Sequence, residues 1–211
     1  MKYKGIVFDL DGVICFTDRY HYRAWKQAVA SLGVPFDETV NNRLRGVSRM
    51  DSLNIILENY TGDLSEEEKL ALCEKKNRIY KKLLSGLSSK DVSKDVLDTL
   101  FYLKGMGVKI AIGSSSKNTK LILKNLGIID VFDAIADGND ILKSKPDPEV
   151  FLKAAEKLKL KPCECAVVED AFAGIEAAKR GGFFAIAIGD ATKSGLADIS
   201  ITKLSDVLEI P

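Results

Sequence analysis

The sequence has no long hydrophobic run and no excess of either charge. Its longest uninterrupted apolar run covers only residues 183–188, whereas a membrane-spanning helix needs about 20 such residues. Asp9 interrupts the amino-terminal segment before a signal-like apolar stretch can develop. Lysine and arginine number 31 against 30 aspartate and glutamate residues, so no global field would attract nucleic acid or an anionic membrane. We therefore expect a cytoplasmic protein that binds neither nucleic acid nor membranes. Separately, we expect a monomer.

Cysteine and histidine are also scarce. The four cysteines, Cys15, Cys73, Cys163 and Cys165, are too few and too irregularly spaced for a disulfide framework in a chain of this size. The Cys163 and Cys165 pair lacks the second pair that a structural metal site would require. His21 is the only histidine, and a lone histidine is more often a structural hydrogen-bonding group than a catalyst.

Two kinds of periodicity divide the chain. Residues 17–91 show helical spacing of apolar residues, interrupted by glycine and proline. The expected helices in this part cover residues 20–32, 37–44, 48–60 and 65–84. From residue 93 onward, strands and helices alternate, which predicts an α/β fold with a mainly parallel, Rossmann-like sheet. The expected strands cover residues 6–8, 108–113, 134–136, 166–168, 184–188 and 199–201. We therefore expect an α/β core of residues 1–16 and 92–211 and an all-helical cap of residues 17–91, inserted after the first strand.

The first strand ends in two carboxylates, Asp9 and Asp11, followed by Gly12. Open α/β sheets bind their ligands at the carboxyl ends of the strands. Residues two apart on a strand point the same way, so about 6–7 Å would separate the two acids, which leaves room for a phosphoryl-sized group. Two like charges in one site resist simultaneous ionisation, which suits one nucleophile and one acid/base group. Taken alone, the two acids could also be turn-forming residues before a glycine.

Polar residues follow three other strands or loops of the second half. Ser114 opens a small-residue loop whose hydroxyls and free backbone N–H groups suit an anion, although serine also caps helices for structural reasons. Lys145 precedes Pro146, and Glu169 with Asp170 follows an apolar strand. If Glu169 and Asp170 lie beside Asp9 and Asp11 at one edge of the sheet, the four acids form an oxygen-rich cluster of the kind that a hard cation such as Mg²⁺ prefers.

The ordered set of these motifs resembles the haloacid dehalogenase superfamily of aspartate-dependent phosphotransferases. The matching pieces are Phe8-Asp9-Leu10-Asp11-Gly12-Val13, Gly113-Ser114-Ser115, Lys145-Pro146-Asp147-Pro148 and Val168-Glu169-Asp170. Within that superfamily the helical insert is similar to the cap of the β-phosphoglucomutase family, in residues 20–25, 45–52 and 75–77. Two positions depart from the family pattern: Phe16 replaces a usual acidic residue at the hinge, and Arg45 stands where lysine is common.

The resemblance implies a role for each matching residue. Asp9 would form an aspartyl phosphate, Asp11 would act as general acid/base, and Ser114 and Lys145 would hold phosphoryl oxygens. Mg²⁺ would be held by Asp9, Glu169 and Asp170 and by the backbone carbonyl of Asp11. The remaining expected contacts are to a hexose phosphate or hexose 1,6-bisphosphate: Thr17, His21, Trp25, Arg45, Gly46, Val47, Ser48, Arg49, Ser52, Lys76, Ser115, Ser116, Lys117 and Asn118.

The activity implied by the resemblance is the interconversion of β-glucose 1-phosphate and glucose 6-phosphate. A mutase must keep its aspartyl phosphate from water, and the helical insert would be the lid that does so. The core motifs fit a sugar-phosphate phosphatase equally well, and only residues 45–52 argue for the mutase. A phospho-receiver switch uses similar groups around one aspartate, but such a binding module has no need of a large helical insert.

Overall fold

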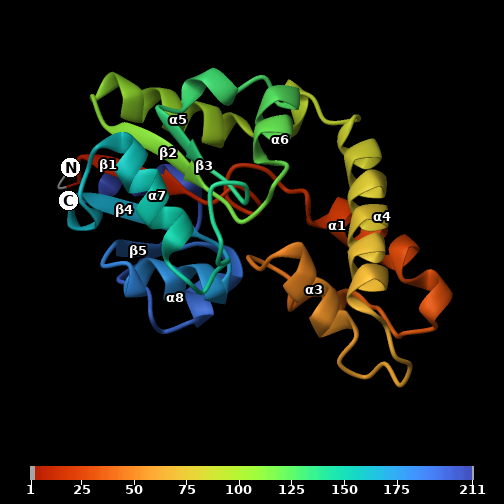
Figure 1. The fold of residues 1–211 in the computed structure, drawn as a ribbon. Helices are drawn as coiled ribbons and strands as arrows, with labels where there is room; N and C mark the ends of the chain where they lie inside the picture. Colours follow the sequence, from red (N-terminus) through yellow and green to blue (C-terminus); the bar gives the residue numbers. More distant parts are fainter. Residues whose placement is uncertain (1–2, 211) are drawn as a thin grey trace.

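The computed structural model describes residues 3–210 and contains a six-stranded, fully parallel sheet (Figure 1). The strand order is β3-β2-β1-β4-β5-β6, so β1 lies in the middle, between β2 and β4. Val7 of β1 is in register with Ala111 of β2 and Val167 of β4. The strands are β1 (Gly5–Phe8), β2 (Lys109–Gly113), β3 (Ala134–Ala136), β4 (Cys165–Glu169), β5 (Phe184–Ala187) and β6 (Ile199–Ser200).

Helices cover both faces of this sheet, and each face has its own apolar cluster. Ile6 and Phe8 pack into the cluster that includes α5 (Lys94–Gly105) and α6 (Thr119–Asn125). Val7 points the opposite way, into the cluster of α7 (Glu149–Leu158) and α8 (Phe172–Arg180). Because both faces are buried, β1 is a continuous apolar run rather than an alternating one. The expected α/β class with a mainly parallel sheet is therefore confirmed.

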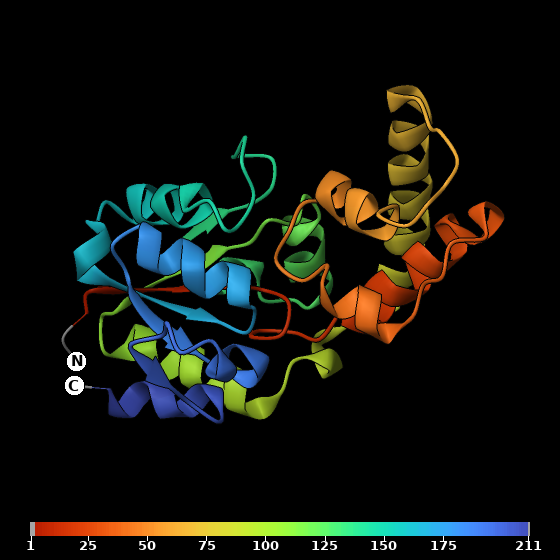
Figure 2. The same cartoon turned by 90° about the horizontal axis from the view of Figure 1, so that it is seen from below.

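The helical insert forms a separate lobe beyond the carboxyl end of β1 (Figures 1 and 2). Its helices are α1 (Asp18–Ala28), α2 (Glu38–Asn42), α3 (Arg49–Ile56) and α4 (Glu66–Leu84). We call this lobe, residues 17–91, the cap. Its own apolar cluster contains Trp25, Ala28 and Leu53. Ser65 and Glu68 cap the first turn of α4 reciprocally, which satisfies backbone N–H groups that a helix start would otherwise leave unpaired.

Three cap helices are shorter than predicted. α2 covers Glu38–Asn42 instead of residues 37–44. α1 ends at Ala28 and a 3₁₀ turn of residues 30–32 follows it, whereas the spacing predicted one helix to Leu32. α3 ends at Ile56 instead of Tyr60. The N–H group of Tyr60 bonds to the carbonyl of Leu57, so the last residues form a tighter turn of the kind common at helix ends.

No helix within residues 3–210 combines the length and the apolar character needed to cross a membrane.

Candidate active site

The carboxyl end of β1 holds Asp9 in a buried position against the next strand. The N–H group of Asp9 donates to the carbonyl of Val168, 2.9 Å away, so the ladder between β1 and β4 fixes the backbone up to this residue. The fully buried Lys145 ammonium donates to Asp9 Oδ1 and, at 2.7 Å, to Glu169 Oε2. The structure therefore brings Asp9, Lys145 and Glu169, which are remote in sequence, into direct contact.

Asp9, Glu169 and Asp170 form a compact group of carboxylates. One oxygen atom from each lies within 4.8 Å of the others. Burial and the charge of Glu169 raise the pKa of Asp9 to about 8 and the pKa of Asp170 to about 9. Burial alone would lower the pKa of Lys145, but the charges of Asp9 and Glu169 raise it above its ordinary value. A single lysine thus compensates the two buried acids and the partly buried Asp170 only in part.

The properties of this carboxylate group fit a divalent cation. Hard cations such as Mg²⁺ bind to carboxylate oxygens and retain several waters. A cation among the three carboxylates would offset the repulsion that raises the pKa values of Asp9 and Asp170, and so keep both ionised. Asp9, Glu169 and Asp170 are the side chains that would hold Mg²⁺.

Two glycines allow the carboxylates to approach the backbone. Gly12 has a φ of 91°, and a Cβ atom placed there would lie 2.0 Å from Asp170 Oδ2. A Cβ atom at Gly174 would lie 1.9 Å from Glu169 Oε2. Both distances are far below any van der Waals contact, so a side chain at either position would have to displace the carboxylate that lies there.

We expect the variant Gly174→Ala to weaken Mg²⁺ binding about tenfold or more, because the new methyl group must displace the Glu169 carboxylate. Isothermal titration with Mg²⁺ measures the affinity directly. Gly105→Ala is a matched control, since no atom lies within 4 Å of a Cβ atom built there. Equal Mg²⁺ affinity in the two variants would exclude Glu169 from the metal site.

Asp11 lies at the start of a hydrogen-bond chain that runs into the cap. The Thr17 hydroxyl donates to Asp11 Oδ1, so the Tyr80 hydroxyl, 2.9 Å from Thr17 Oγ1, donates to Thr17 in turn. Burial raises the pKa of Asp11 to about 6, while the hydrogen bond from Thr17 opposes that rise. A carboxyl group with this pKa can gain and lose a proton near neutral pH, as general acid/base catalysis requires.

His21 and Lys76 form a second buried pair on the cap side. Lys76 Nζ lies 3.0 Å from His21 Nδ1, and it also lies 4.3 Å from the centre of the Tyr80 ring. Burial and the nearby positive charges lower the pKa of His21 well below its ordinary value, so His21 is neutral. Burial and the charge of Arg49 lower the pKa of Lys76 to about 7.

A cavity of about 610 Å³ lies between the core and the cap, and most of the expected site residues line it. From the core, Asp9, Asp11 and Asp170 contribute to its wall. The other expected residues that line it are His21, Arg45, Gly46, Val47, Ser48, Arg49, Ser52, Lys76, Ser114, Ser115, Ser116, Lys117 and Asn118. The carboxylates of the core and the cations of the cap thus face the same cavity.

Four expected residues lie behind the cavity wall. Lys145 and Glu169 are buried beneath Asp9, and Thr17 lies behind Asp11. Trp25 is only 1% exposed and packs in the apolar cluster of the cap, so this structure does not place it where it would touch a substrate. Its position follows from the tight packing of α1 on α4, which buries the apolar face of α1.

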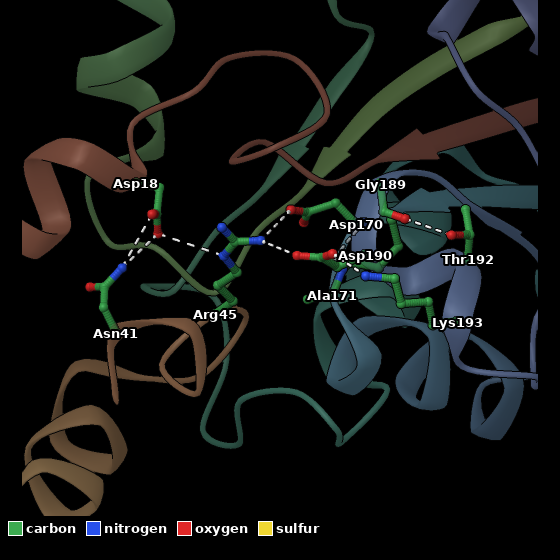
Figure 3. Close-up of polar contacts among 10 residues, drawn as sticks. Asp18, Asn41, Arg45, Asp170, Ala171, Gly189, Asp190, Thr192 and Lys193 are labelled. Carbon is green, nitrogen blue, oxygen red and sulfur yellow. Dashed lines mark hydrogen bonds and ion pairs between the residues drawn. The ribbon is translucent and has the colours of Figure 1, made fainter. Parts of the chain in front are cut away.

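The cavity wall also includes residues that the sequence analysis did not select. Asp190, Asp18 and Asn41 line it, and Figure 3 shows how Asp18 and Asp190 lie on opposite sides of Arg45. Asp190 follows β5, so the rule that ligands bind at the carboxyl ends of strands could have identified it. Asp18 and Asn41 belong to the cap, where no comparable positional rule exists.

Known proteins resemble the whole chain, in sequence and in structure. The model of a family described as haloacid dehalogenase-like hydrolase matches residues 3–182. The chain is 42% identical over 210 residues to the β-phosphoglucomutase of Bacillus subtilis, across 97% of this chain and 91% of that protein. It is 30% identical over 182 residues to the phosphorylated carbohydrates phosphatase of Thermotoga maritima, across 85% of this chain and 82% of that protein.

The similarity to a solved structure extends over both the core and the cap. The crystal structure of β-phosphoglucomutase from Clostridium difficile matches with a TM-score of 0.92 and 37% sequence identity, across 97% of this chain and 93% of that chain. The resemblance read from the sequence motifs is therefore confirmed, and so is the Rossmann-like core with its inserted cap. The chain belongs to the haloacid dehalogenase-like hydrolase family of enzymes, and within it the chain is similar to β-phosphoglucomutase.

Proposed function

We propose that this member of the phosphotransferase and phosphatase family is a Mg²⁺-dependent β-phosphoglucomutase. Its reaction is the interconversion of β-glucose 1-phosphate and glucose 6-phosphate through a hexose 1,6-bisphosphate. The observation that supports it best is the two-sided cavity, with Asp9 on the core side and Arg49 on the cap side. A bisphosphate needs a phosphate site at each end, and a guanidinium can grip a phosphate bidentately. The 42% identity to the B. subtilis β-phosphoglucomutase supports the same assignment.

In this proposal Asp9 is the nucleophile. Its carboxylate attacks phosphorus, a covalent Asp9–phosphoryl bond forms, and the bond from phosphorus to the leaving sugar oxygen breaks. Mg²⁺, when bound by Asp9, Glu169 and Asp170, would neutralise the charge between the attacking anion and the phosphate. Lys145, which already contacts Asp9 and Glu169, orients the nucleophile. Ser114 lines the cavity beside it and holds a phosphoryl oxygen.

Asp11 moves the proton of the sugar hydroxyl. When the sugar oxygen attacks the phosphorylated Asp9, Asp11 accepts the hydroxyl proton, and in the reverse step it donates that proton to the leaving oxygen. The cap excludes water during these steps, which favours transfer to a sugar over hydrolysis.

A phosphatase is the second candidate, because the chain is also 30% identical to a phosphorylated carbohydrates phosphatase. The two reactions share the chemistry at Asp9 and differ in the acceptor, which is sugar or water. A single assay separates them: the enzyme is incubated with β-glucose 1-phosphate, Mg²⁺ and a trace of the 1,6-bisphosphate. The proposal predicts glucose 6-phosphate with little free phosphate. Free phosphate without glucose 6-phosphate would refute the mutase and support the phosphatase.

We expect Thr17→Val to move the acid limb of the kcat/KM profile to higher pH. Thr17 donates to Asp11 and thereby lowers its pKa against the effect of burial, so losing this hydroxyl raises the pKa of Asp11 above about 6. A larger fraction of Asp11 is then protonated at pH 6 and cannot accept the sugar proton. Activity should fall most below neutral pH and recover at higher pH.

Thr99→Val is the control for this change, because the Thr99 hydroxyl is buried in α5 without a hydrogen-bond partner in the described structure. Its pH profile should match that of the unmodified enzyme. An acid limb that stays in place in Thr17→Val would mean that another group takes the proton.

A further inference from the structure

Arg45 is a cap residue whose guanidinium reaches three carboxylates around the cavity (Figure 3). Arg45 Nε lies 3.7 Å from Asp18 Oδ1, within the cap. On the core side, Arg45 Nη1 lies 3.1 Å from Asp190 Oδ2 and 4.0 Å from Asp170 Oδ2. Among the ion pairs within residues 3–210, only those of Arg45 connect the cap to the core.

Asp190 is attached to the acid cluster through the backbone. It lies in the 3₁₀ segment Gly189–Lys193, which follows β5. The N–H group of Ala191 donates to the carbonyl of Asp170 at 2.9 Å, and the Thr192 hydroxyl donates to the carbonyl of Gly189 at 2.7 Å. These bonds hold the backbone around Asp190 beside Asp170, and Lys193 Nζ lies 3.1 Å from Asp190 Oδ1.

The two core carboxylates that pair with Arg45 differ in whether they belong to the group that would bind Mg²⁺. Asp170 belongs to the carboxylate group that fits Mg²⁺, so its charge is shared with a cation when the enzyme is loaded. Asp190 lies outside that group. It therefore remains an anion available to Arg45 with or without metal. Arg45 also begins the segment of residues 45–49, whose Gly46, Val47 and Arg49 line the cavity.

We propose that Asp190 is a positioning residue that binds Arg45 when the cap closes, and thereby fixes the segment of residues 45–49 over the substrate. Two hydrogen bonds between the cap and the core assist: Asp51 accepts from Ser144 Oγ at 2.9 Å, and Asn77 accepts from Asn118 Nδ2 at 3.0 Å. Because neither of these contacts is an ion pair, the salt sensitivity of closure arises at the ion pairs of Arg45, of which the one with Asp190 is shorter than the one with Asp170. This inference rests on the proposed function only for its kinetic readout.

The kinetic test is a double-mutant cycle of Arg45→Gln and Asp190→Asn. Asp190→Asn should raise KM about threefold to tenfold with a smaller change in kcat, since an exposed charge pair contributes modestly. In the Arg45→Gln background the same change should have little further effect, which is the signature of coupling. The KM of the unmodified enzyme should rise with salt, and the KM of Asp190→Asn should rise less.

Two further variants separate positioning from a general effect on the fold. Asp190→Glu keeps the carboxylate and should restore much of the affinity. Lys193→Gln removes the other ion-pair partner of Asp190, and Lys193 is an exposed residue of the core. It should leave KM unchanged. A cycle in which the two single effects add fully, or a Lys193→Gln effect as large as that of Asp190→Asn, would overturn the proposal.

Cap closure itself can be measured without substrate or metal. Cys163 is the one exposed cysteine among the four, and it lies in the core, while Glu67 is exposed at the start of α4 in the cap. Spin labels at Cys163 and at a cysteine introduced by Glu67→Cys report the distance between core and cap. Asp190→Asn should broaden this distance distribution toward longer values, and unchanged distributions would refute the proposal. If closure responds to Asp190 but β-glucose 1-phosphate is not converted, the proposed function fails and this inference stands.

Discussion

Replacing Asp9 by asparagine is expected to lower turnover of β-glucose 1-phosphate by at least about 10⁴-fold, because an amide cannot form the covalent phosphoryl bond. The change should leave the fold intact. Asparagine has nearly the shape of aspartate, and its carbonyl oxygen can still accept from Lys145, which donates to Asp9 Oδ1. Thermal unfolding should therefore occur close to the temperature of the unmodified enzyme, and the loss should appear in kcat.

Asp63→Asn makes the same chemical change at an exposed position of the cap. It should retain full activity. Phosphotransfer by Asp9→Asn at more than about a hundredth of the normal rate would mean that another group is the nucleophile. Asp11→Asn should differ from Asp9→Asn. Removal of the proton-transfer group should lower the turnover rate about 10²–10⁴-fold but still allow phosphorylation of Asp9.

Lys145→Met is expected to affect both activity and stability. Methionine fills a similar volume but removes the cation that contacts Asp9 and Glu169 at a position that is 1% exposed. Leaving buried charges without their partner costs about 3–5 kcal/mol of unfolding free energy. Loss of the group that orients the nucleophile should lower kcat by a further about 10²–10³-fold. Denaturant unfolding and steady-state kinetics measure the two effects separately.

Added Mg²⁺ should restore part of the stability of Lys145→Met, since a cation bound by Asp9, Glu169 and Asp170 offsets the same negative charge. The control is Lys143→Met, an exposed lysine two residues away, which should behave like the unmodified enzyme. If Lys145→Met unfolds at the same denaturant concentration as Lys143→Met, the contact with Asp9 and Glu169 contributes nothing to folding.

The core half of the site was predictable because its geometry follows from a general rule. Parallel strands end at one edge, so Asp9, Ser114 and Glu169, each at or next to a strand end, had to lie near one another. The strand-end rule does not locate Lys145, because a long loop separates this residue from β3. Only the sequence motif around Lys145 indicated that it belongs to the site. The same rule applied to β5 would have added Asp190.

The cap half depended on family resemblance, because helical periodicity alone does not determine where a lid docks. Apolar spacing predicted the cap helices, yet it could not show that Arg45 reaches Asp190 or that Asp51 accepts from Ser144. Trp25 illustrates the same limit. The apolar spacing of an amphipathic helix does not show whether a large aromatic residue packs inside the cap or lines the cavity. In the structure it packs against the cap interior.

The proposed reaction depends most on Asp9 as the residue that carries the phosphoryl group. The direct measurement is brief incubation with glucose 1,6-bisphosphate and Mg²⁺, an acid quench, cleavage after lysine and arginine, and mass spectrometry of the fragments. Residues 5–19 form one such fragment, which contains Asp9 and Asp11 and follows Lys4. We expect one added phosphoryl group on this fragment, located on Asp9 by fragmentation and absent from Asp9→Asn. A phosphoryl group found on any other residue, or none found while turnover proceeds, would contradict the proposed reaction.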